Sequence, residues 1–376
     1  MSVRILHVIG NMNRGGAETY LMRILRHVDR EKYPMDFLVH TAEDCAYGEE
    51  IRRLGARLLP CPHPHRPWTY ARNFRRIVRD YGPYDVIHSQ MNLFSGIVMR
   101  LAYRAGIPLR IAQVHEYRDI RPQTLRRRLY VRWMHRWIVK YAQHVVVPSR
   151  TTLDSFCRSP LGAHPPHMEV VYSLVDLEQF AQPVDRQAVR RRLGLPADAL
   201  LVVYVARFAP HKNHVQVLRI ARAMHGSGLN LHFVLAGSHG EVIDEVSQAA
   251  RREANVTVLT GLPDVTELLL AADLFVFPSL NEGLGLVAIE AAAAGLPVVA
   301  TRMPSIEEAC AASHRAYMFP PDDDRTACNH IATILSDRDL YARLSQDAKQ
   351  WAANFSVERT LTRLTRIYAS VNERSE

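Results

Sequence analysis

The chain has 376 residues, 48% of them apolar and 23% charged, which is enough for two domains with ordinary hydrophobic cores. Its apolar stretches are far shorter than the roughly 20 residues that span a bilayer, and its N-terminus has no signal-peptide pattern. Five scattered cysteines without a CxxC motif are typical of the reducing cytosol. Residues 1–180 carry 27 Lys and Arg against 16 Asp and Glu, a net charge of +11, while the remainder carries 20 against 22, a net charge of −2. The basic half suggests an anionic partner, either a membrane surface or a nucleic acid. Because 43 of the 47 basic residues are Arg, a genome rich in arginine codons explains the excess at least as well.

Short apolar runs that predict strands alternate with stretches of helical periodicity along the chain. The expected strands are Arg4–Ile9, Met35–His40, Val86–Ser89, Leu109–Val114, His144–Pro148, Val170–Tyr172, Leu200–Ala206, Leu231–Ala236, Val256–Thr260, Leu274–Pro278 and Pro297–Thr301. Amphipathic segments such as Thr19–His27 and Leu286–Ala294 lie between them. This alternation predicts βαβ units with parallel sheets, an α/β fold, in which ligands bind at the loops that follow the strands.

One stretch without a predicted strand, residues 176–198, separates two such sets of elements. It contains two prolines and a short Arg-rich helix, which is typical of a domain junction. We therefore expect two doubly wound domains, residues 1–180 and 181–355. The segment 356–376 has the pattern of an amphipathic final helix with no strand after it.

The strongest site pattern follows the expected strand Leu274–Pro278. Glu282 precedes the Gly-rich turn Gly283-Leu284-Gly285, and Glu290 lies eight positions further on, inside the next helix. Free N–H groups at a helix start bind anions, which fits a diphosphate there and a ribose held by Glu290. The alternative is that Glu282 only caps the helix and Glu290 faces solvent. The apolar neighbours of Glu290 argue against a solvated face.

Three weaker patterns also follow predicted strands. Arg207 and Lys212 could hold a leaving diphosphate, although basic residues are common in loops. Gly15-Gly16 would let the backbone approach a ligand, although a plain strand–helix turn explains the pair equally well. His115 could hydrogen-bond a sugar, although a surface histidine without a function is the more common case.

The helix expected over residues 121–141 carries two parallel stripes. Basic residues and large apolar residues each recur every four positions: Arg128, Arg132, Arg136 and Lys140, beside Leu129, Trp133, Trp137 and Tyr141. One interpretation is a helix at an anionic lipid surface. The other places the aromatic stripe in the core.

Metal and cofactor motifs are lacking. Asp322-Asp323-Asp324 follows two prolines and precedes a helix, so we interpret it as a helix cap. The chain has no P-loop and no zinc motif. The strand Pro297–Thr301 is followed by Arg302, where a dinucleotide-binding site would carry an acid that holds the ribose of NAD. We expect no metal and no resident cofactor.

Taken together, these motifs resemble the retaining glycosyltransferases of family 4, which have the GT-B fold. The resemblance covers most of the chain. The supporting motifs, in order, are Gly15-Gly16-Ala17-Glu18, His115, Arg207 to His214, Gly261-Leu262-Pro263-Asp264-Val265, and Glu282 to Glu290. It implies two Rossmann-like domains facing across a cleft, the first binding the acceptor, the second the nucleotide sugar, with the final helix packed back on the first.

The resemblance also implies roles for individual residues. Arg207 and Lys212 would neutralise the leaving diphosphate, Glu290 would hold the ribose, and Glu282 a hydroxyl of the donor sugar. Gly261 and Leu262 would lie against the base, Gly16 near the phosphate and His115 near the sugar. The resemblance further implies transfer without a metal and with retention, because cations and a helix dipole already stabilise the leaving group.

Three segments depart from the family pattern. They are Ser173-Leu174-Val175-Asp176 at the junction, the widely spaced glycines of Gly237-Ser238-His239-Gly240, and Arg302-Met303-Pro304-Ser305 after the last expected strand.

The sequence therefore predicts a cytoplasmic transferase, peripheral on the membrane, that moves a hexose or N-acetylhexosamine from a nucleotide sugar to a glycan or lipid-linked acceptor of bacterial exopolysaccharide or lipopolysaccharide synthesis. UDP-sugars are the first choice of donor and GDP-mannose the second. A nucleotide-sugar epimerase on the same fold is the alternative. A non-catalytic nucleic-acid-binding protein is a third, less favoured because no nucleic-acid-binding motif occurs.

Overall fold

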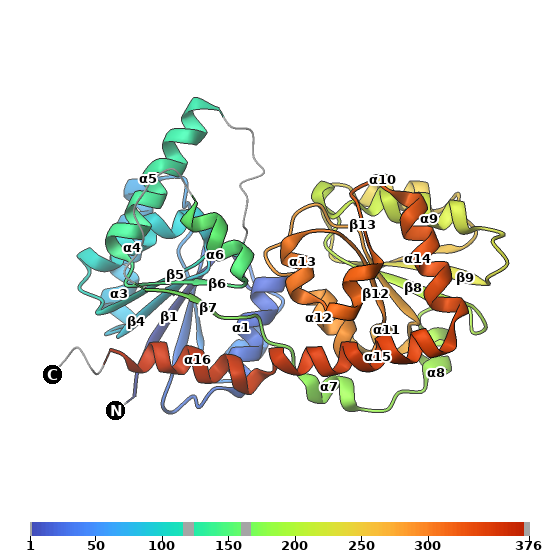
Figure 1. Ribbon diagram of the computed structural model, residues 1–376. Helices are drawn as coiled ribbons and strands as arrows, with labels where there is room; N and C mark the ends of the chain where they lie inside the picture. Colours follow the sequence, from blue (N-terminus) through green and yellow to red (C-terminus); the bar gives the residue numbers. More distant parts are fainter. Residues whose placement is uncertain (1, 116–123, 159–166, 372–376) are drawn as a thin grey trace. The chain divides into compact units, whose positions relative to one another are not determined.

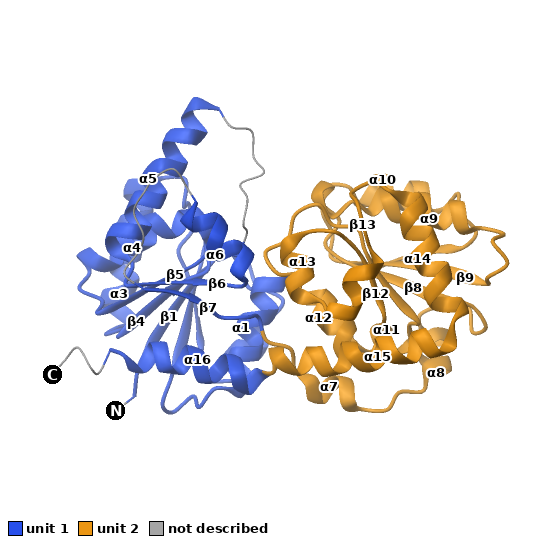
Figure 2. Ribbon diagram, in the orientation of Figure 1, with its two compact units in different colours: residues 1–173, 357–376 blue, residues 174–356 orange. Residues whose placement is uncertain are grey.

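The computed structural model describes residues 2–115, 124–158 and 167–371. The chain divides into two compact units, coloured separately in Figure 2: unit 1 is residues 1–173 with 357–376, and unit 2 is residues 174–356. The division falls earlier than the boundary expected after residue 180. The reason is that Val175 already bonds to the end of unit 2, where its N–H donates to the carbonyl of Phe355 at 2.8 Å.

The described strands of unit 1 form a parallel sheet (Figure 1). It has seven strands in the order β3-β2-β1-β4-β5-β6-β7. They are β1 (Ile5–Ile9), β2 (Met35–Val39), β3 (Arg57–Pro60), β4 (Val86–Ser89), β5 (Leu109–Gln113), β6 (His144–Val147) and β7 (His167–Val170). The helices are α1 (Gly16–His27), α2 (Gly48–Arg53), α3 (Pro67–Tyr81), α4 (Ser95–Arg104), α5 (Leu125–Tyr141), α6 (Arg150–Cys157) and α16 (Val357–Ala369), with the 3-10 turn η1 (Asn92–Phe94). The strand order reverses between β1 and β4, the kind of point at which doubly wound folds bind ligands.

Unit 2 has a six-stranded parallel sheet in the order β10-β9-β8-β11-β12-β13. The strands are β8 (Leu200–Val205), β9 (Leu231–Gly237), β10 (Val256–Thr260), β11 (Leu274–Phe277), β12 (Val298–Thr301) and β13 (Met318–Phe319). The helices are α7 (Leu177–Ala181), α8 (Arg186–Arg192), α9 (His214–Met224), α10 (Ile243–Ala250), α11 (Thr266–Ala271), α12 (Leu286–Ala293), α13 (Pro304–Ala309), α14 (Asp324–Ser336) and α15 (Arg338–Ala352). The 3-10 turns are η2 (Pro210–Lys212), η3 (Ala312–Tyr317) and η4 (Ala353–Phe355). Two parallel, doubly wound units confirm the α/β fold expected from the alternation of strands and helices.

Most strand predictions match within a residue, and the mismatches lie on the outer strands. The strand expected at Val170–Tyr172 begins instead at His167, because β7 pairs with β6 through His144↔His167 to Val147↔Val170. The sequence missed β3 and β13. β3 and β7 are partly exposed edge strands, so their sequences carry a weaker apolar signal than a central strand that is covered on both faces. β13 is buried but has only two residues, too few to show a pattern.

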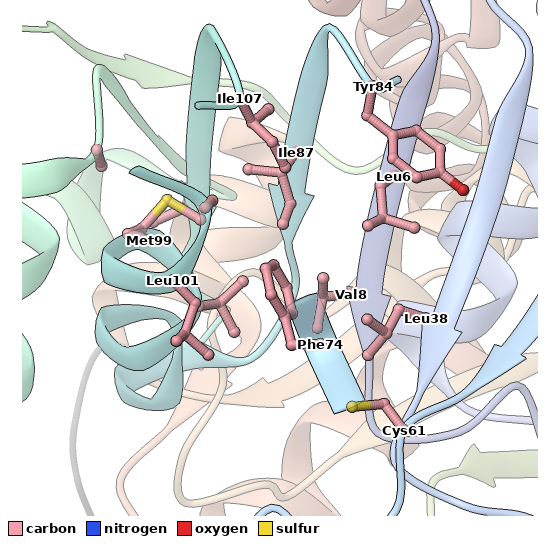
Figure 3. Close-up of a cluster of buried hydrophobic side chains, with 14 of the residues drawn as sticks. Leu6, Val8, Leu38, Cys61, Phe74, Tyr84, Ile87, Met99, Leu101 and Ile107 are labelled. Carbon is pink, nitrogen blue, oxygen red and sulfur yellow. The ribbon is translucent and has the colours of Figure 1, made fainter. Parts of the chain in front are cut away.

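Apolar side chains on one face of the unit 1 sheet form a continuous core (Figure 3). Leu6 and Val8 of β1 contribute to it from the sheet, and Phe74 of α3 and Met99 of α4 from the helices; all four are fully buried. The intervening residue of β1, His7, points to the opposite face, because side chains alternate along a strand.

Helix α16 completes that opposite face of unit 1. The hydroxyl of Tyr368 lies 2.9 Å from Nδ1 of His88 on β4, and Thr360 Oγ1 donates to the carbonyl of Tyr172 at 3.0 Å. Helix α16 therefore packs its buried face against the rest of unit 1, although in the chain it comes after all of unit 2.

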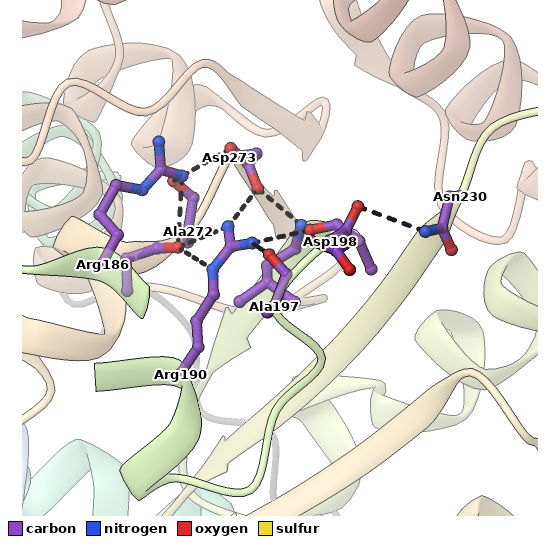
Figure 4. A network of polar contacts seen from close by, with 10 residues as sticks. Arg186, Arg190, Ala197, Asp198, Asn230, Ala272 and Asp273 are labelled. Atoms are coloured by element: carbon purple, nitrogen blue, oxygen red, sulfur yellow. Dashed lines mark hydrogen bonds and ion pairs between the residues drawn. The ribbon is translucent and has the colours of Figure 1, made fainter. Parts of the chain in front are cut away.

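A buried ion-pair network fixes α8 to the sheet of unit 2 (Figure 4). Asp273, just before β11, accepts from Arg186 at 2.5 Å, from Arg190 at 2.7 Å and from the N–H of Leu201 at 2.8 Å. Arg190 is 6% exposed and donates further to the carbonyls of Ala197, Ala199 and Ala271.

We expect Asp273→Ala to lower the free energy of unfolding by about 3–5 kcal/mol, because it leaves the buried guanidinium of Arg190 without its counter-charge. A urea titration measures this. Asp80→Ala, which breaks the exposed Arg79–Asp80 pair, is the control and should leave the unfolding curve nearly unchanged. Equal effects of the two variants would contradict the structural role of the network.

Candidate functional site

Most of the residues singled out by sequence in unit 2 lie on loops at one edge of its sheet. All strands of this sheet are parallel, so the loops after β8, β10 and β11 leave from the same edge. They carry Arg207 and Lys212, Gly261 and Leu262, and Glu282 with Gly283-Leu284-Gly285, respectively. Strand β8 lies beside β11, so the first and third loops are neighbours.

Hydrogen bonds join the β8 and β11 loops directly. The N–H of Leu280 donates to the carbonyl of His211 at 2.8 Å. The buried hydroxyl of Tyr204 donates to the carbonyl of Lys212 at 2.7 Å and lies 2.9 Å from Ser279 Oγ. Burial, and then the nearby Glu282, raise the pKa of Tyr204 well above its usual value, so this phenol stays protonated and can donate.

Lys212 and Glu282 form an ion pair across these loops. The Nζ atom of Lys212 lies 2.6 Å from Oε1 of Glu282, and the side chains are only 18% and 12% exposed. Glu282 therefore does not cap α12; the N-cap position is Gly285. The sequence singled out both residues for separate tasks, and gave no sign that they pair.

Helix α12 begins at a glycine whose backbone conformation and packing exclude a side chain. Gly285 adopts a left-handed conformation with φ of 80°, and a Cβ there would lie 2.8 Å from the ring of Phe277. Glycine also has no side chain that could cap the helix. In the first turn, the N–H of Ala288 donates to the carbonyl of Gly285 at 2.9 Å. Anion binding at this N-terminus stays a prediction from the Gly-rich pattern.

Glu290 lies on α12 and is 7% exposed, so it does not face solvent. Buried carboxylates are normally paired, so burial alone does not assign Glu290 a ligand. The solvated-face alternative is therefore wrong, and ligand binding remains a prediction.

Two glycines shape the loop that carries Arg207. A Cβ on Gly237 would lie 1.8 Å from the carbonyl oxygen of Ala206, and one on Gly240 would lie 2.1 Å from that of Phe208. The β9 loop thus packs backbone to backbone against the β8 loop, which only glycine permits at these positions. This close packing gives a structural reason for the spacing of Gly237 and Gly240, which departs from the family pattern. Arg207 itself is exposed.

In unit 1, Gly15 and Gly16 connect β1 to α1. Gly15 is the N-cap of α1, and a Cβ on it would lie 2.4 Å from a carboxylate oxygen of Glu18. A Cβ on Gly16 would meet nothing within 4 Å, so the backbone is open on that side.

His115 follows β5 in unit 1 and is held by two residues that the sequence analysis missed. Its N–H donates to Asn92 Oδ1 at 2.6 Å, and its Nε2 lies 3.0 Å from Gln90 Oε1. Burial lowers the pKa of His115 to about 4, so the ring is neutral at neutral pH. The sequence could have indicated Gln90 and Asn92 as site residues, because they follow strand β4 at the same edge of the sheet as His115.

The exposed surface of α5 carries the predicted basic stripe. Arg128, Arg132, Arg136 and Lys140 are exposed. Leu129 and Trp133 are also exposed, at 49% and 54%, because the buried face of the helix consists of Met134, His135 and Ile138. The interpretation that places these two residues in the core is therefore wrong. Trp137 is partly covered, with the Arg100 guanidinium 4.4 Å from its ring centroid.

The described part of the chain holds no cluster of His, Cys, Asp or Glu suited to a metal ion. Asp323 instead caps α14, its Oδ1 accepting from the N–H of Thr326 at 2.9 Å, as expected for the Asp322–Asp324 run. No helix in the described ranges is long and apolar enough to cross a membrane.

Comparison with known proteins identifies the family. Residues 185–351 match the model of the glycosyl transferases group 1, and residues 15–173 that of the glycosyl transferase 4-like domain. A putative glycosyltransferase EpsF from Bacillus subtilis is 33% identical over 311 residues, covering 79% of this chain and 78% of that protein. A D-inositol 3-phosphate glycosyltransferase from Thermobispora bispora is 30% identical over 314 residues, covering 78% and 72%.

Solved structures agree on the fold. Alr3699/HepE from Anabaena, in complex with UDP and glucose, aligns with a TM-score of 0.83 and 19% identity, covering 98% of this chain and 100% of that one. WaaG, a glycosyltransferase involved in lipopolysaccharide biosynthesis, aligns with a TM-score of 0.74 and 16% identity, covering 97% and 99%. The chain therefore belongs to the GT4-type glycosyltransferases with the GT-B fold.

Proposed function

We propose that this glycosyltransferase moves a hexose or N-acetylhexosamine from a nucleoside-diphosphate sugar to a glycan or lipid-linked acceptor, in the synthesis of a bacterial surface polysaccharide. UDP-sugars are the first choice of donor and GDP-mannose the second. The family assignment favours a transferase over the epimerase and the nucleic-acid-binding protein.

The observation that carries the proposal is the loop cluster of unit 2. A largely buried cation–carboxylate pair, an exposed arginine and the N-terminus of α12 lie at the carboxyl edge of one parallel sheet. This set suits a ligand with a diphosphate and sugar hydroxyls. Structural neighbours bound to UDP or UDP-glucose support UDP as the nucleotide. The involvement of WaaG in lipopolysaccharide biosynthesis supports a surface polysaccharide as the product.

The chemistry we assign to the loops is charge stabilisation. Arg207, Lys212 and the α12 N-terminus would counter the negative charge that grows on the diphosphate as the sugar leaves. Lys212 would then contact the phosphate as well as Glu282. The carboxylate of Glu282 could therefore also accept a hydrogen bond from a sugar hydroxyl. Glu290 would accept hydrogen bonds from the ribose, and Gly261 and Leu262 would lie against the base. These protein groups supply the stabilisation that a metal gives other transferases, so we propose that transfer needs no metal.

Retention of the anomeric configuration follows from the resemblance to a retaining family. In this proposal the acceptor oxygen attacks from the face that the diphosphate leaves. The departing phosphate oxygen takes the proton of the acceptor hydroxyl, so no protein nucleophile is required. Residues of unit 1, Gly16 and His115 among them, would contact the phosphate and a sugar hydroxyl.

The test is product analysis with UDP-glucose, UDP-galactose, UDP-N-acetylglucosamine and GDP-mannose, each offered with alkyl glycosides and polyprenyl-linked sugars in buffer containing EDTA. We expect one donor to give a product whose one-bond coupling between C1 and H1 shows an α linkage. A β-linked product would contradict retention. An epimerised nucleotide sugar without transfer would instead support the epimerase.

We further propose that the exposed surface of α5 docks on anionic lipid. A cation near such a surface contributes about 1 kcal/mol, and Trp133 is suited to the headgroup region. Reversing Arg128 and Arg132 to Glu should release the protein from phosphatidylglycerol vesicles in a co-sedimentation assay. The matched control reverses Arg251 and Arg252, which are exposed in unit 2. Unchanged binding of the α5 variant would contradict the proposal.

A further inference from the structure

A glutamine that follows the neighbouring strand β4 lies beside the ring of His115. Gln90 follows β4 directly, is 4% exposed, and donates its own N–H to the carbonyl of Val8 at 2.8 Å. Its side-chain Oε1 lies 3.0 Å from Nε2 of His115. The structure places the amide oxygen of Gln90 toward the ring, an arrangement in which Nε2 of His115 carries the ring hydrogen, and it leaves the amide nitrogen of Gln90 buried without a partner among the described residues. The other nitrogen, Nδ1, is then left with a lone pair that can accept.

The backbone of His115 is fixed independently of its ring. Asn92, two residues after Gln90, accepts from the His115 N–H at 2.6 Å and adopts a φ of 48°, a left-handed conformation that asparagine tolerates. The loop after β4 thus holds both the main chain and the imidazole ring of His115, which lies after the neighbouring strand β5. Such double support keeps a functional side chain in one orientation.

The neighbouring histidines, His7 and His88, are neutral, so neither adds a charge beside the ring of His115. The buried His88 lies on the same face of the sheet, where burial, His7 and His115 lower its pKa well below the usual value. Burial also lowers the pKa of His7 to about 3. Both neighbours are therefore neutral at neutral pH. Tyr368 of α16 occupies Nδ1 of His88 at 2.9 Å, so this hydroxyl is engaged elsewhere.

We propose that Gln90 is a positioning residue that holds His115 as its Nε2–H tautomer, so that Nδ1 accepts a hydrogen bond from a hydroxyl of the transferred sugar. The second half of this statement rests on the proposed function, because it takes His115 to contact the sugar. The first half concerns the protein alone and can be tested without any ligand.

The first arm of the test is NMR of the protein labelled with 15N-histidine at pH 7. Two-bond proton–nitrogen correlations distinguish the two tautomers, and the His115 signals are those missing from His115→Gln. We expect the Nε2–H form alone in the wild type, and a mixture in Gln90→Leu. An Nδ1–H ring in the wild type, or an unchanged tautomer in the leucine variant, would overturn the proposal.

The second arm uses Gln90→Glu, which keeps an acceptor oxygen but adds a charge. A carboxylate stabilises the imidazolium, so the pKa of His115 should rise from about 4 toward or beyond its ordinary 6.5. Below the raised pKa, Nδ1 carries a proton and can no longer accept. In this variant, affinity for UDP-glucose should therefore decrease as the pH is lowered through the raised pKa. In the wild type, the affinity should stay constant above pH 5. Gln187→Glu, on the exposed surface of α8, controls for the added charge.

The binding measurements separate this proposal from the proposed function. By calorimetry at pH 7, Gln90→Leu should bind UDP-glucose more weakly by the factor by which its Nε2–H population falls, about twofold for an even mixture of tautomers, with affinity for UDP unchanged. Equal losses for UDP and UDP-glucose would contradict a contact to the sugar. If the wild type bound neither compound, the UDP-sugar donor would be wrong, and the NMR result would still decide the role of Gln90.

Discussion

Lys212→Ala should lower kcat by about a hundredfold to a thousandfold, the usual effect of removing one group that stabilises charge developing in a transition state. Lys212 is largely buried, and its ammonium is directed by the 2.6 Å contact with Glu282 and by Tyr204, which holds its carbonyl. A cation placed in this way can respond to phosphate charge without rearranging the loop. Steady-state kinetics with the donor found by product analysis measures the effect.

Two further variants show whether the loss comes from chemistry or from folding. Lys212→Ala alone leaves Glu282 without its partner, which costs stability. The double variant Lys212→Ala/Glu282→Gln removes that unpaired charge, so thermal stability should recover while turnover stays low. Lys349→Ala changes an exposed lysine of the same unit and should match the wild type. Normal turnover in the double variant would show that the pair is structural only.

Gly237→Ala should destabilise the protein by about 3 kcal/mol, the upper end of the range for overpacking, because its Cβ would stand 1.8 Å from the carbonyl oxygen of Ala206. Backbone cannot turn aside as a flexible side chain can, so the β8 and β9 loops must separate. Urea titration measures the loss of stability. Gly10→Ala is the matched control, because a Cβ on Gly10 would meet nothing within 4 Å.

The same substitution should also weaken donor binding in the protein that remains folded. Arg207 follows Ala206 directly, so any displacement of that carbonyl moves the arginine. We expect Gly237→Ala to raise the Kd for the nucleoside diphosphate. A stable Gly237→Ala variant with wild-type binding would mean that the close packing of the two loops is not needed.

The sequence predicts the fold and the position of the candidate site for one physical reason. Central parallel strands are buried on both faces and stand out as apolar runs, as β8 and β11 do. Once those strands are known, parallel pairing puts their following loops at one edge. Residues such as Lys212 and Glu282 are therefore expected near each other before their distance is known.

The remainder depends on contacts that strand spacing does not encode. The Lys212–Glu282 pair joins loops 70 positions apart in the chain. Gln90 stands out only when its distance to His115 is known. The i+4 stripes of α5 give two possible buried faces, and the side containing Met134 and Ile138 is chosen by packing against the rest of unit 1.

The central claim is that the loop cluster of unit 2 binds the diphosphate and ribose of a nucleotide sugar. The most direct measurement is isothermal titration calorimetry with UDP, GDP and ADP in the presence of EDTA, on the wild type and on Glu290→Gln. We predict that one nucleotide, UDP first, binds the wild type without added metal and binds Glu290→Gln at least about tenfold more weakly, because a ribose hydroxyl loses a charged acceptor. Equal affinity in both proteins, or no binding of any nucleotide to the wild type, would contradict this account.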